Sequence, residues 1–490
     1  MKKVQLFALT TLLATLCAGC GGKESSGVTS STGGIGNTSS SVHHDPVTIT
    51  YSAWNLGAAD AETPNLDRMM IDEFEKQYPW ITVNVMERPN NPGTTDPQNW
   101  SEFLAARASV GKLPDVFMVD TLPNYVSNNW VMDITSLVNS DPDYALLSDD
   151  VTSAAVYKNM TFALPIAIYY HGYVVNKTLF YNQGSEIPTA DTTFDEFINE
   201  IKGAADHTSG GTGHAGIEGI EHIIHCYPSL INDAMQWYTF DGEKFNLDSP
   251  EFRQAVDFYL SIYNDKSISY DVLTTEERID FFGEGDPFPG GKMLAKWYGS
   301  YSLGSLQASK DDGTIDFALD FIGFPGVGDV KKTPISMDFN AVSSQTKHPE
   351  EAYLLAKWMG FGKEGYAKRL ELSTTVDGLS LVSYAPLIPD QELLDKYFAL
   401  YPTFKEYRKV IESQSFISEP VKYMVGYDQV RYQGTYDAEH TMFGIVAEIL
   451  NGTTKLADVS TSLNKRANEI YQENLKDFNE KLEQYYITAA

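Results

Sequence analysis

Two groups of side chains between residues 211 and 225 have types and spacing that could do chemistry. Gly211 to Gly216 (GTGHAG) fits the G-x-G-x-x-G pattern of dinucleotide-binding loops. That loop must follow a strand, whereas a predicted helix precedes it here, so we interpret the segment as a flexible loop. His214, His222, His225 and Glu221 lie within a dozen residues, and His222 and His225 could share one face of a helix and bind a metal. Without a Cys or Asp at ligand spacing, structural or solvated histidines are the favoured interpretation.

Carboxylates are numerous, and a glycoside hydrolase needs two of them on either side of a scissile bond. The sequence brings no such pair together, and no enzyme motif is recognisable. We therefore expect a protein that is not an enzyme and that uses no cofactor and no metal.

Cys20 has the setting of a lipid-acceptor cysteine. Lys2 and Lys3 precede an apolar run, Val4 to Leu16, that is too short to span a bilayer, and Ala18-Gly19-Cys20 forms a small-residue cleavage site. This pattern resembles a bacterial lipoprotein signal, with Cys17 at a position usually held by Leu. We expect residues 1–19 to be removed and Cys20 to carry acyl chains such as palmitate. A plain secretory signal with a free Cys20 is the alternative.

The segment from 20 to 46 is dominated by Gly, Ser and Thr, which predicts a flexible tether. Through it the lipid anchor would hold an exported protein on the outer face of a cell membrane, and we expect a Gram-positive cell. The lipid anchor is the only membrane contact that we predict.

The formal net charge of −30 argues against nucleic acid and anionic lipid as partners, and it favours a neutral or cationic ligand. An acidic surface that only keeps the protein soluble is the alternative explanation. Apart from the signal and Cys20, Cys226 is the remaining cysteine, so no intrachain disulfide is expected. A body of this length, from about residue 47 to 490, is long enough for two lobes.

Strand-like and helix-like segments alternate along the body, which predicts an α/β fold. Residues 47–51, 81–86 and 114–120 have the composition of strands, and residues 64–77 and 103–109 have the periodicity of helices. Further helices are expected at 193–205, from 249, at 349–359, and over most of 437–486 with a turn at 451–452.

Short motifs occur along the body in an order that matches a known family. They are Pro114 to Phe117, Leu164 to Ala167, Val175 to Phe180, Ile187-Pro188, Thr193 to Glu196, Gly291 to Met293, Trp297 to Tyr301, Phe324 to Gly326 and Asn340 to Ser343. In this order the chain resembles the family 1 extracellular solute-binding proteins of ABC importers, in the oligosaccharide-binding group that includes maltose-binding protein. Phe194 stands where the family often has Trp, and the chain is longer than most members.

The resemblance implies a type II periplasmic-binding-protein-like fold, with two α/β lobes, hinge crossings and a ligand cleft between the lobes. The first crossing is expected near 167–172, the return near 336–340, and a third between 394 and 413. The N-terminal lobe would hold 47–166 plus 341–401, and the C-terminal lobe 172–335 plus 402–490.

The resemblance also implies a function. A monomeric binding protein would capture a neutral oligosaccharide and deliver it to the permease subunits of an ABC transporter. The alternatives are another solute, such as a peptide, a polyol phosphate or an acidic sugar, or a surface glycoside hydrolase.

A sugar ligand needs flat aromatic platforms for its C–H faces and carboxylates or amides for its hydroxyls. The chain has 29 Tyr and 7 Trp to supply platforms. Trp54, Asn55 and Asp120 follow predicted strands at their carboxyl ends, where open α/β sheets bind ligands. A core Trp and a helix-capping Asp are the alternatives for these positions.

Other candidates rest on the resemblance. Tyr169 and Tyr170 lie on the first crossing, where alternation sends one of them to the cleft. Trp297 and Tyr298 also alternate, and Tyr301 matches a family aromatic that stacks on sugar. Asp338, on the return crossing, would accept sugar hydroxyls or bond the hinge backbone instead. Tyr432 and Tyr436 precede a late helix where the family also presents aromatics.

Overall fold

A strand of 13 residues, β6 (Leu164–Asn176), organises the fold. Its first part pairs antiparallel with β10 (Thr333–Val342), and its second part pairs antiparallel with β8 (Met293–Gly299) and β9 (Leu319–Gly323). The partner changes between Tyr170, which lies opposite Ile335, and His171, which lies opposite Gly299. β6 therefore runs from one half of the sheet into the other at the position predicted for the first crossing.

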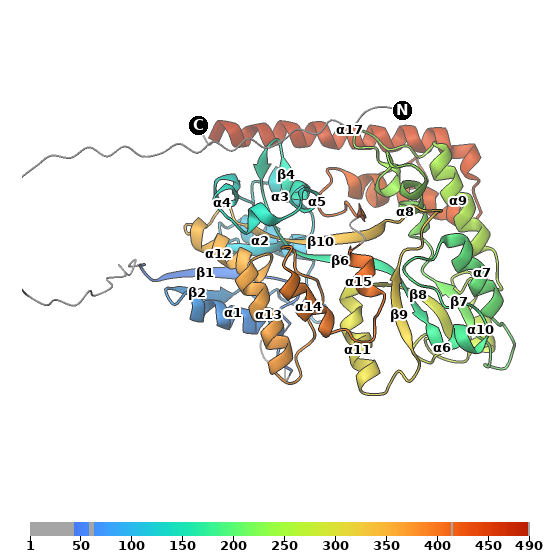
Figure 1. Cartoon of the computed structure of the whole chain (residues 1–490). Coiled ribbons are helices and arrows are strands. Elements are labelled where there is room, and N and C mark those ends of the chain that lie inside the picture. The colour runs from blue at the N-terminus through green and yellow to red at the C-terminus, as the bar shows by residue number, and fades with distance from the viewer. Residues whose placement is uncertain (1–43, 58–62, 413–414, 489–490) are drawn as a thin grey trace, which may run out of the picture. The chain divides into compact units, whose positions relative to one another are not determined.

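The structure is a computed structural model that describes residues 44–57, 63–412 and 415–488 (Figure 1). The predicted signal segment, Cys20 and the predicted tether up to residue 43 lie outside the described residues. Residues 46–490 form one compact unit.

Strands from distant parts of the chain make one mixed sheet, which confirms the predicted α/β class. The order is β2-β1-β3-β10-β6-β8-β7, with β11 beside β10 and β9 beside β6. β1 is parallel to β2 and β3, and β10 is antiparallel to β3. The remaining strands are β1 (Val47–Ser52), β2 (Ile81–Val85), β3 (Val116–Val119), β7 (Ala215–Glu218), β11 (Phe416–Ser418) and the separate pair β4 (Val156–Tyr157) and β5 (Met160–Thr161).

Gly172 marks the point where β6 passes β9. A Cβ added at Gly172 would lie 2.1 Å from the carbonyl carbon of Gly323, so a side chain has no room there. The close approach explains why a glycine follows the change of partner on β6.

Helices gather around the two halves of the sheet (Figure 1). The half with β1 and β2 carries α1 (Leu66–Gln77), α2 (Trp100–Ala108), α3 (Leu122–Ser127), α4 (Thr135–Asn139), α5 (Asp149–Thr152), α12 (Pro349–Met359), α13 (Lys363–Thr375) and α14 (Gln391–Ala399). The half with β7 and β8 carries α6 (Lys177–Asn182), α7 (Phe194–Ala204), α8 (Ile223–Ile231), α9 (Pro250–Tyr263), α10 (Thr275–Phe282) and α11 (Leu303–Asp311). Later come α15 (Tyr407–Glu412), a π-helical turn η5 (Gln429–Gln433), α16 (Met442–Leu450) and α17 (Leu456–Thr488).

Capping residues set the helix starts. α1 begins at Leu66, two residues after the predicted start, with Asn65 as its cap, and Thr193 with Glu196 forms the predicted capping box of α7. α2 begins at Trp100, three residues before the predicted start, because Asn99 supplies its cap. The flexible-loop prediction for 211–216 is wrong in part, since Ala215 and Gly216 belong to β7 and pair beside β8.

Two hydrophobic cores form inside this unit. The first is built largely around β1, β3 and α12, and it extends to parts of α10, α11 and β8. The second is built around α7, α8, α9 and α16. α17 contributes to both, with Leu463 and Ile470 in the second core and Phe478 and Leu482 in the first. The predicted lobe boundaries stay a prediction, and α17 shows that residues 402–490 do not pack with one core alone.

Candidate functional site

Alternation along β10 sends polar side chains to one face of the crossing strands. Ser336 and Asp338 share this face because they are two residues apart. The Oγ of Ser336 lies 2.8 Å from Nε2 of His171 on β6. The carboxylate of Asp338 accepts a hydrogen bond from the ammonium of Lys422, and the Asp338 residue is only 6% exposed. One face of the crossing therefore carries hydroxyl, imidazole, carboxylate and ammonium groups.

Lys422 connects this face to Trp54, at the carboxyl end of β1. Its Nζ lies 5.6 Å from the centre of the Trp54 ring, within cation–π range. Trp54 packs edge-on against Trp100, with ring centres 5.4 Å apart. The carbonyl of Lys422 accepts a 2.8 Å hydrogen bond from the amide of Leu122. Trp54 and Asp338 thus lie within reach of a single ammonium, as two of the predicted ligand residues.

Five rings form a continuous series that we call the aromatic row: Tyr169, Tyr301, His171, Trp297 and His222. Tyr169 and Tyr301 meet edge-on with ring centres 5.5 Å apart, and His171 lies 5.9 Å from Tyr301. Trp297 lies nearly parallel to His171 at 6.3 Å and to His222 at 4.2 Å. Tyr301 is 54% exposed, so a ring face remains open to a ligand.

The two histidines of the row are neutral at pH 7. Burial, reinforced by the charge of Lys422, lowers the pKa of His171 to about 4. Burial, then His171 and Arg431, lowers the pKa of His222 to about 3. A neutral imidazole offers one donor and one acceptor nitrogen, which suits a hydroxyl that can play either part.

Next to Tyr169 and Asp338 lies a cavity of about 320 Å³, which we call the Asp338 hollow. Asp67 and Arg369 form an ion pair at 2.6 Å on its wall, and the Nδ2 of Asn55 donates to Asp67 at 2.9 Å. Its other polar and aromatic lining includes Thr63, Asn65, Ser380, Ser383 and Tyr384. The hollow therefore combines amide, carboxylate, guanidinium and hydroxyl groups beside a ring of the aromatic row.

The sequence reasoning missed Asp67, Arg369 and Tyr384. Asp67 lies in the first turn of α1, where an acidic residue is expected for the helix dipole alone. Arg369 lies in α13 and is only 4% exposed, and its role follows from a partner 302 residues away. No local pattern distinguishes either residue from an ordinary surface charge.

Asp120, at the end of β3, is half-buried and held by its own neighbourhood. It accepts hydrogen bonds from the hydroxyl of Tyr125 and, at 3.1 Å, from that of Ser101. Burial, reinforced by the nearby Asp120 carboxylate, raises the pKa of Tyr125. Asp120 belongs to the same edge of the sheet as Trp54, but its carboxylate already has two donors.

The other predicted residues divide between exposed and core positions. Tyr432 is 38% exposed and stacks on Phe443 at 6.1 Å. Tyr170 is buried against Tyr407 and Phe416, so Tyr169 is the member of that pair on the face of the aromatic row.

Trp297 and Tyr298, the second alternating pair, also face opposite sides of their strand. Tyr298 packs on Phe288, whereas Trp297 joins the aromatic row. The hydroxyl of Tyr436 lies 2.7 Å from that of Ser462 on α17, and its ring packs on the second core. Tyr170, Tyr298 and Tyr436 are therefore not brought together with the others.

Arg431, in the π-helical turn η5, is buried behind the row. It is 4% exposed, and its Nη2 lies 3.3 Å from Nε2 of His225. Its guanidinium faces the rings of Tyr432 at 4.9 Å and Tyr238 at 5.5 Å. None of the carboxylates in the described residues forms an ion pair with Arg431, and its Nε and Nη1 have no hydrogen-bond partner.

In the part of the chain that the structure describes, no group of three or more His, Cys, Asp or Glu side chains is arranged to hold a metal ion. None of its helices combines the length and the apolar character needed to cross a membrane.

Comparison with known proteins identifies both the family and the fold. The family model of bacterial extracellular solute-binding proteins matches residues 59–361. Comparison with curated proteins gives no significant match.

Many solved structures are similar to this chain. One is the ABC substrate-binding protein Lmo0181 from Listeria monocytogenes in complex with cycloalternan, with 19% identity, a TM-score of 0.62, and coverage of 88% of this chain and 99% of that one. Another is the cyclic α-maltosyl-1,6-maltose binding protein from Arthrobacter globiformis, with 15% identity, a TM-score of 0.60, and coverage of 87% and 100%. A third is the sugar-binding protein MalE from Xanthomonas citri, with 14% identity, a TM-score of 0.61, and coverage of 88% and 99%. At these identities the likeness shows the fold alone, and it confirms the predicted two-lobed, type II arrangement.

Proposed function

Because the chain belongs to the family of bacterial extracellular solute-binding proteins, we propose that it is the lipid-anchored substrate-binding component of an ABC transporter. In this proposal it captures a neutral oligosaccharide between its lobes and delivers it to the permease subunits. The solved structures of similar fold include proteins described as bound to cycloalternan, mannobiose and mannotriose, which supports a sugar as the ligand class.

The observation that carries the proposal is the aromatic row beside the Asp338 hollow. Sugar C–H faces pack on aromatic rings, and Tyr301 has more than half of its surface free for such a contact. Hydroxyls need donors and acceptors within hydrogen-bond reach, and Asn55, Asp67 and Arg369 line the adjoining hollow. Rings and polar groups side by side match the two kinds of surface that a pyranose presents.

The preference for a neutral sugar rests on how the charges of the site are paired. Asp67 is paired with Arg369 and Asp338 with Lys422, so each of these charges already has an opposite partner. A charged ligand would have to compete with these pairs and to lose its own hydration. Hydroxyls can instead bond to the outer lone pairs and N–H groups of the pairs without disrupting them.

The family supports an exported protein that works with an ABC transporter. The proposal goes beyond the family in four points. It includes anchoring through Cys20, a tether at 20–46, delivery to a permease and a monomeric state. Closure of the lobes would be stabilised by a sugar that contacts both, because a ligand shifts a conformational equilibrium only through its differential affinity.

An acidic sugar is the second candidate, and Arg431 is the observation that favours it. A guanidinium that is 4% exposed and forms no ion pair with the described carboxylates lies next to Tyr432 and His225. A buried charge without a counter-ion is costly, and a ligand carboxylate could compensate it. The neutral sugar is preferred because the rings of Tyr238 and Tyr432 already face this cation.

Calorimetric titration tests the proposal. The purified protein is titrated with neutral α- and β-linked oligosaccharides and with the corresponding uronic acid oligosaccharides, and chromatography follows any product. Saturable heat with the neutral series and no product is the expected result. Saturable heat with the uronic acid oligosaccharides alone would show that the ligand is an acidic sugar. Release of a product would show that the protein is a glycoside hydrolase instead.

A further inference from the structure

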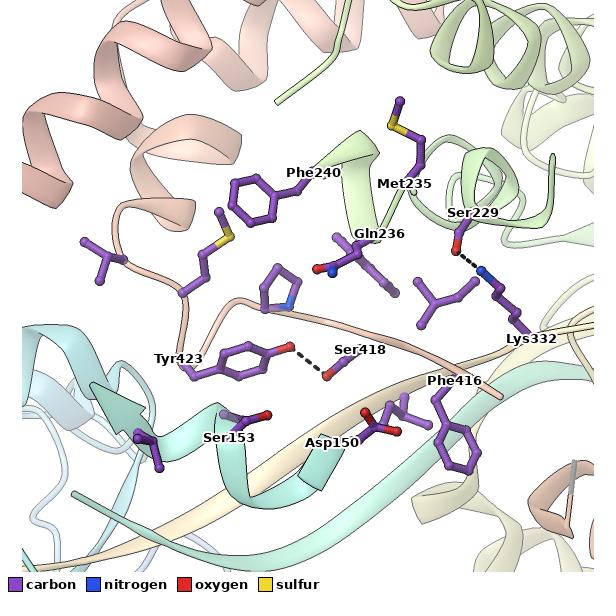
Figure 2. A pocket seen from close by; sticks show the side chains of 18 of the residues that line it. Asp150, Ser153, Ser229, Met235, Gln236, Phe240, Lys332, Phe416, Ser418 and Tyr423 are labelled. Atoms are coloured by element: carbon purple, nitrogen blue, oxygen red, sulfur yellow. Dashed lines mark hydrogen bonds between the residues drawn. The ribbon is translucent and has the colours of Figure 1, made fainter. Parts of the chain in front are cut away.

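A second cavity lies on the other face of the crossing strands. It has a volume of about 500 Å³, and we call it the rear pocket (Figure 2). Ile335 of β10 lines it, whereas its neighbour Ser336 contacts His171 on the face of the aromatic row. None of the predicted ligand residues lines the rear pocket. The family site therefore does not explain it.

Five parts of the chain line it. α5 and the following turn supply Asp150 and Ser153, and the segment after α8 supplies Met235, Gln236, Trp237 and Phe240. The segment from Phe416 to Val425 forms a further wall, and β10 and α17 contribute Ile335, Tyr471 and Leu475. Figure 2 shows Asp150, Gln236 and Tyr423 around the same space, although they come from three of these segments.

The lining of the rear pocket contains one ion pair, between Lys332 and Asp233, and one unpaired charge, on Asp150. Lys332 lies 3.1 Å from the carboxylate of Asp233 and 3.0 Å from the hydroxyl of Ser229, so its charge is satisfied within the wall. Asp150 takes part in no ion pair and no hydrogen bond from its carboxylate among the described residues. The exposed and unpaired carboxylate of Asp150 favours a positively charged occupant, as does the net charge of −30 on the whole chain.

Two aromatic residues of the pocket have their polar ends in hydrogen bonds to other protein groups. The Nε1 of Trp237 donates to the hydroxyl of Tyr427 at 2.8 Å, and the hydroxyl of Tyr423 donates to Ser418 at 2.7 Å. What these side chains offer to the cavity is therefore ring surface, and Phe240 and Phe416 add more. Ring faces together with one exposed, unpaired carboxylate are the recognition elements of an organic ammonium ion.

The turn from Pro420 to Met424 separates the rear pocket from the aromatic row. Pro420 and Tyr423 line the rear pocket, while Lys422 between them bonds to Asp338 and lies over Trp54. The turn is held to the rest of the molecule by the amide of Leu122, which donates to the carbonyl of Lys422, and by the hydroxyl of Tyr157, which donates to the carbonyl of Tyr423. A molecule that packs on Tyr423 therefore contacts the turn that positions the neighbouring Lys422.

We propose that the rear pocket binds a small organic ammonium ion, and that its occupancy is coupled through the Pro420–Met424 turn to Lys422 and the aromatic row. Coupling of this kind is reciprocal, so a ligand on either side changes the affinity of the other by the same factor. Binding at the rear pocket does not depend on the sugar proposed for the other face.

Benzyltrimethylammonium is the probe, because it combines a ring with a fixed positive charge. Calorimetric titration into the full chain is expected to show one saturable site. Asp150→Asn keeps the size of the side chain and removes its charge, and we expect it to weaken binding about tenfold. Asp149→Asn is the matched control, since Asp149 precedes Asp150 in α5 and does not line the pocket; it should leave the affinity within twofold.

The coupling is read without a sugar, from hydrogen exchange of the Leu122 amide that bonds to Lys422. Saturation with the probe should change its exchange rate at least threefold in the wild type and not in Asp150→Asn. Equal weakening by the two Asn variants would show a general charge effect and overturn the site, as would phenylacetate binding in place of the cation. Probe binding with an unchanged Leu122 amide would overturn the coupling. A failure to bind any sugar would affect only the proposed function.

Discussion

Lys422 and Asp338 form an ion pair that joins the late segment after β11 to the crossing strand β10. The Asp338 residue is 6% exposed, so its carboxylate is buried and depends on this one ammonium. The same ammonium lies 5.6 Å from the centre of the Trp54 ring. The pair therefore ties three segments together at the centre of the candidate site.

Replacing Lys422 with Met is expected to destabilise the protein by about 3 kcal/mol, because it leaves a buried carboxylate without its partner. Urea unfolding measures the change. The double variant Asp338→Asn with Lys422→Met should recover a large part of the loss, since the buried charge is then gone. Lys396→Met breaks an exposed pair with Glu392 and should change stability by no more than about 0.5 kcal/mol. Equal losses at Lys422 and Lys396 would contradict the buried pair.

Removing the ring of Tyr301 should weaken sugar binding without unfolding the protein. Tyr301 is 54% exposed and contacts Tyr169 and His171 through its ring, so Tyr301→Ala removes a platform and little of the core. We expect a loss of about tenfold or more in affinity for the best oligosaccharide of the panel. Tyr181→Ala is the control, because Tyr181 is 74% exposed and lies on α6, outside the row. If the Tyr301→Ala variant kept full affinity for the oligosaccharide, the aromatic row would not be the binding surface.

The elements were predictable from the sequence where local pattern decides them. β1 and α1 follow from β-branched residues and from a helical periodicity. The crossing at Ala167–Gly172 and the return at Ser336–Asn340 came from the family resemblance, and the partner change of β6 after Tyr170 agrees with the first.

The partners inside the site were not predictable. Arg369 reaches Asp67 across 302 positions, and Lys422 reaches Asp338 across 84, so no window of sequence contains either pair. Alternation correctly required that Tyr169 and Tyr170 face opposite sides, but only packing against Tyr407 decides that Tyr170 is the buried one. Long-range packing, which propensity does not encode, decided these outcomes.

Acidification should destabilise the protein through the half-buried, neutral His222. The pKa of His222 is about 3 in the folded chain, below the roughly 6.5 of an unfolded histidine. The unfolded chain therefore binds more protons, and stability is lost as the pH falls from about 7 towards 3. Between pH 7.5 and pH 5 this one residue contributes a loss of about 2 kcal/mol.

His222→Phe isolates this contribution, because it keeps a ring against Trp297 and cannot be protonated. Urea unfolding at pH 7.5 and at pH 5 should show a smaller acid loss in the variant than in the wild type. His44→Phe is the control near the start of the described chain, where the residue is exposed. An equal acid loss in His222→Phe and the wild type would show that His222 is protonated in the folded state.

Lipid attachment at Cys20 should be visible in cells. Cys20→Ala is expected to abolish incorporation of an alkyne-labelled palmitate and to release the protein from the membrane fraction. Cys17→Ala alters the neighbouring cysteine and should leave both intact, since lipidation requires the residue after the cleavage site. Continued labelling of Cys20→Ala would leave a plain secretory signal as the better interpretation.

Leu482→Ala tests which part of the molecule the end of α17 stabilises. Leu482 is fully buried in the first core, whereas Leu463, earlier in the same helix, is fully buried in the second. Each truncation to Ala should cost about 3 kcal/mol through lost burial and a residual cavity. Lys481→Ala, on the exposed side, should cost less than about 0.5 kcal/mol.

The two cores distinguish where the helix belongs. If they unfold in separate transitions, Leu482→Ala should shift the transition that Phe117→Ala in β3 also shifts, and Leu463→Ala should shift the other. In that case α17 spans both lobes, and residues 402–490 cannot be assigned to the C-terminal lobe as one piece. A shift of the same transition by Leu482→Ala and Leu463→Ala, without Phe117→Ala, would restore that assignment. A single transition shifted by all three variants would instead mean that α17 makes the two cores one cooperative unit.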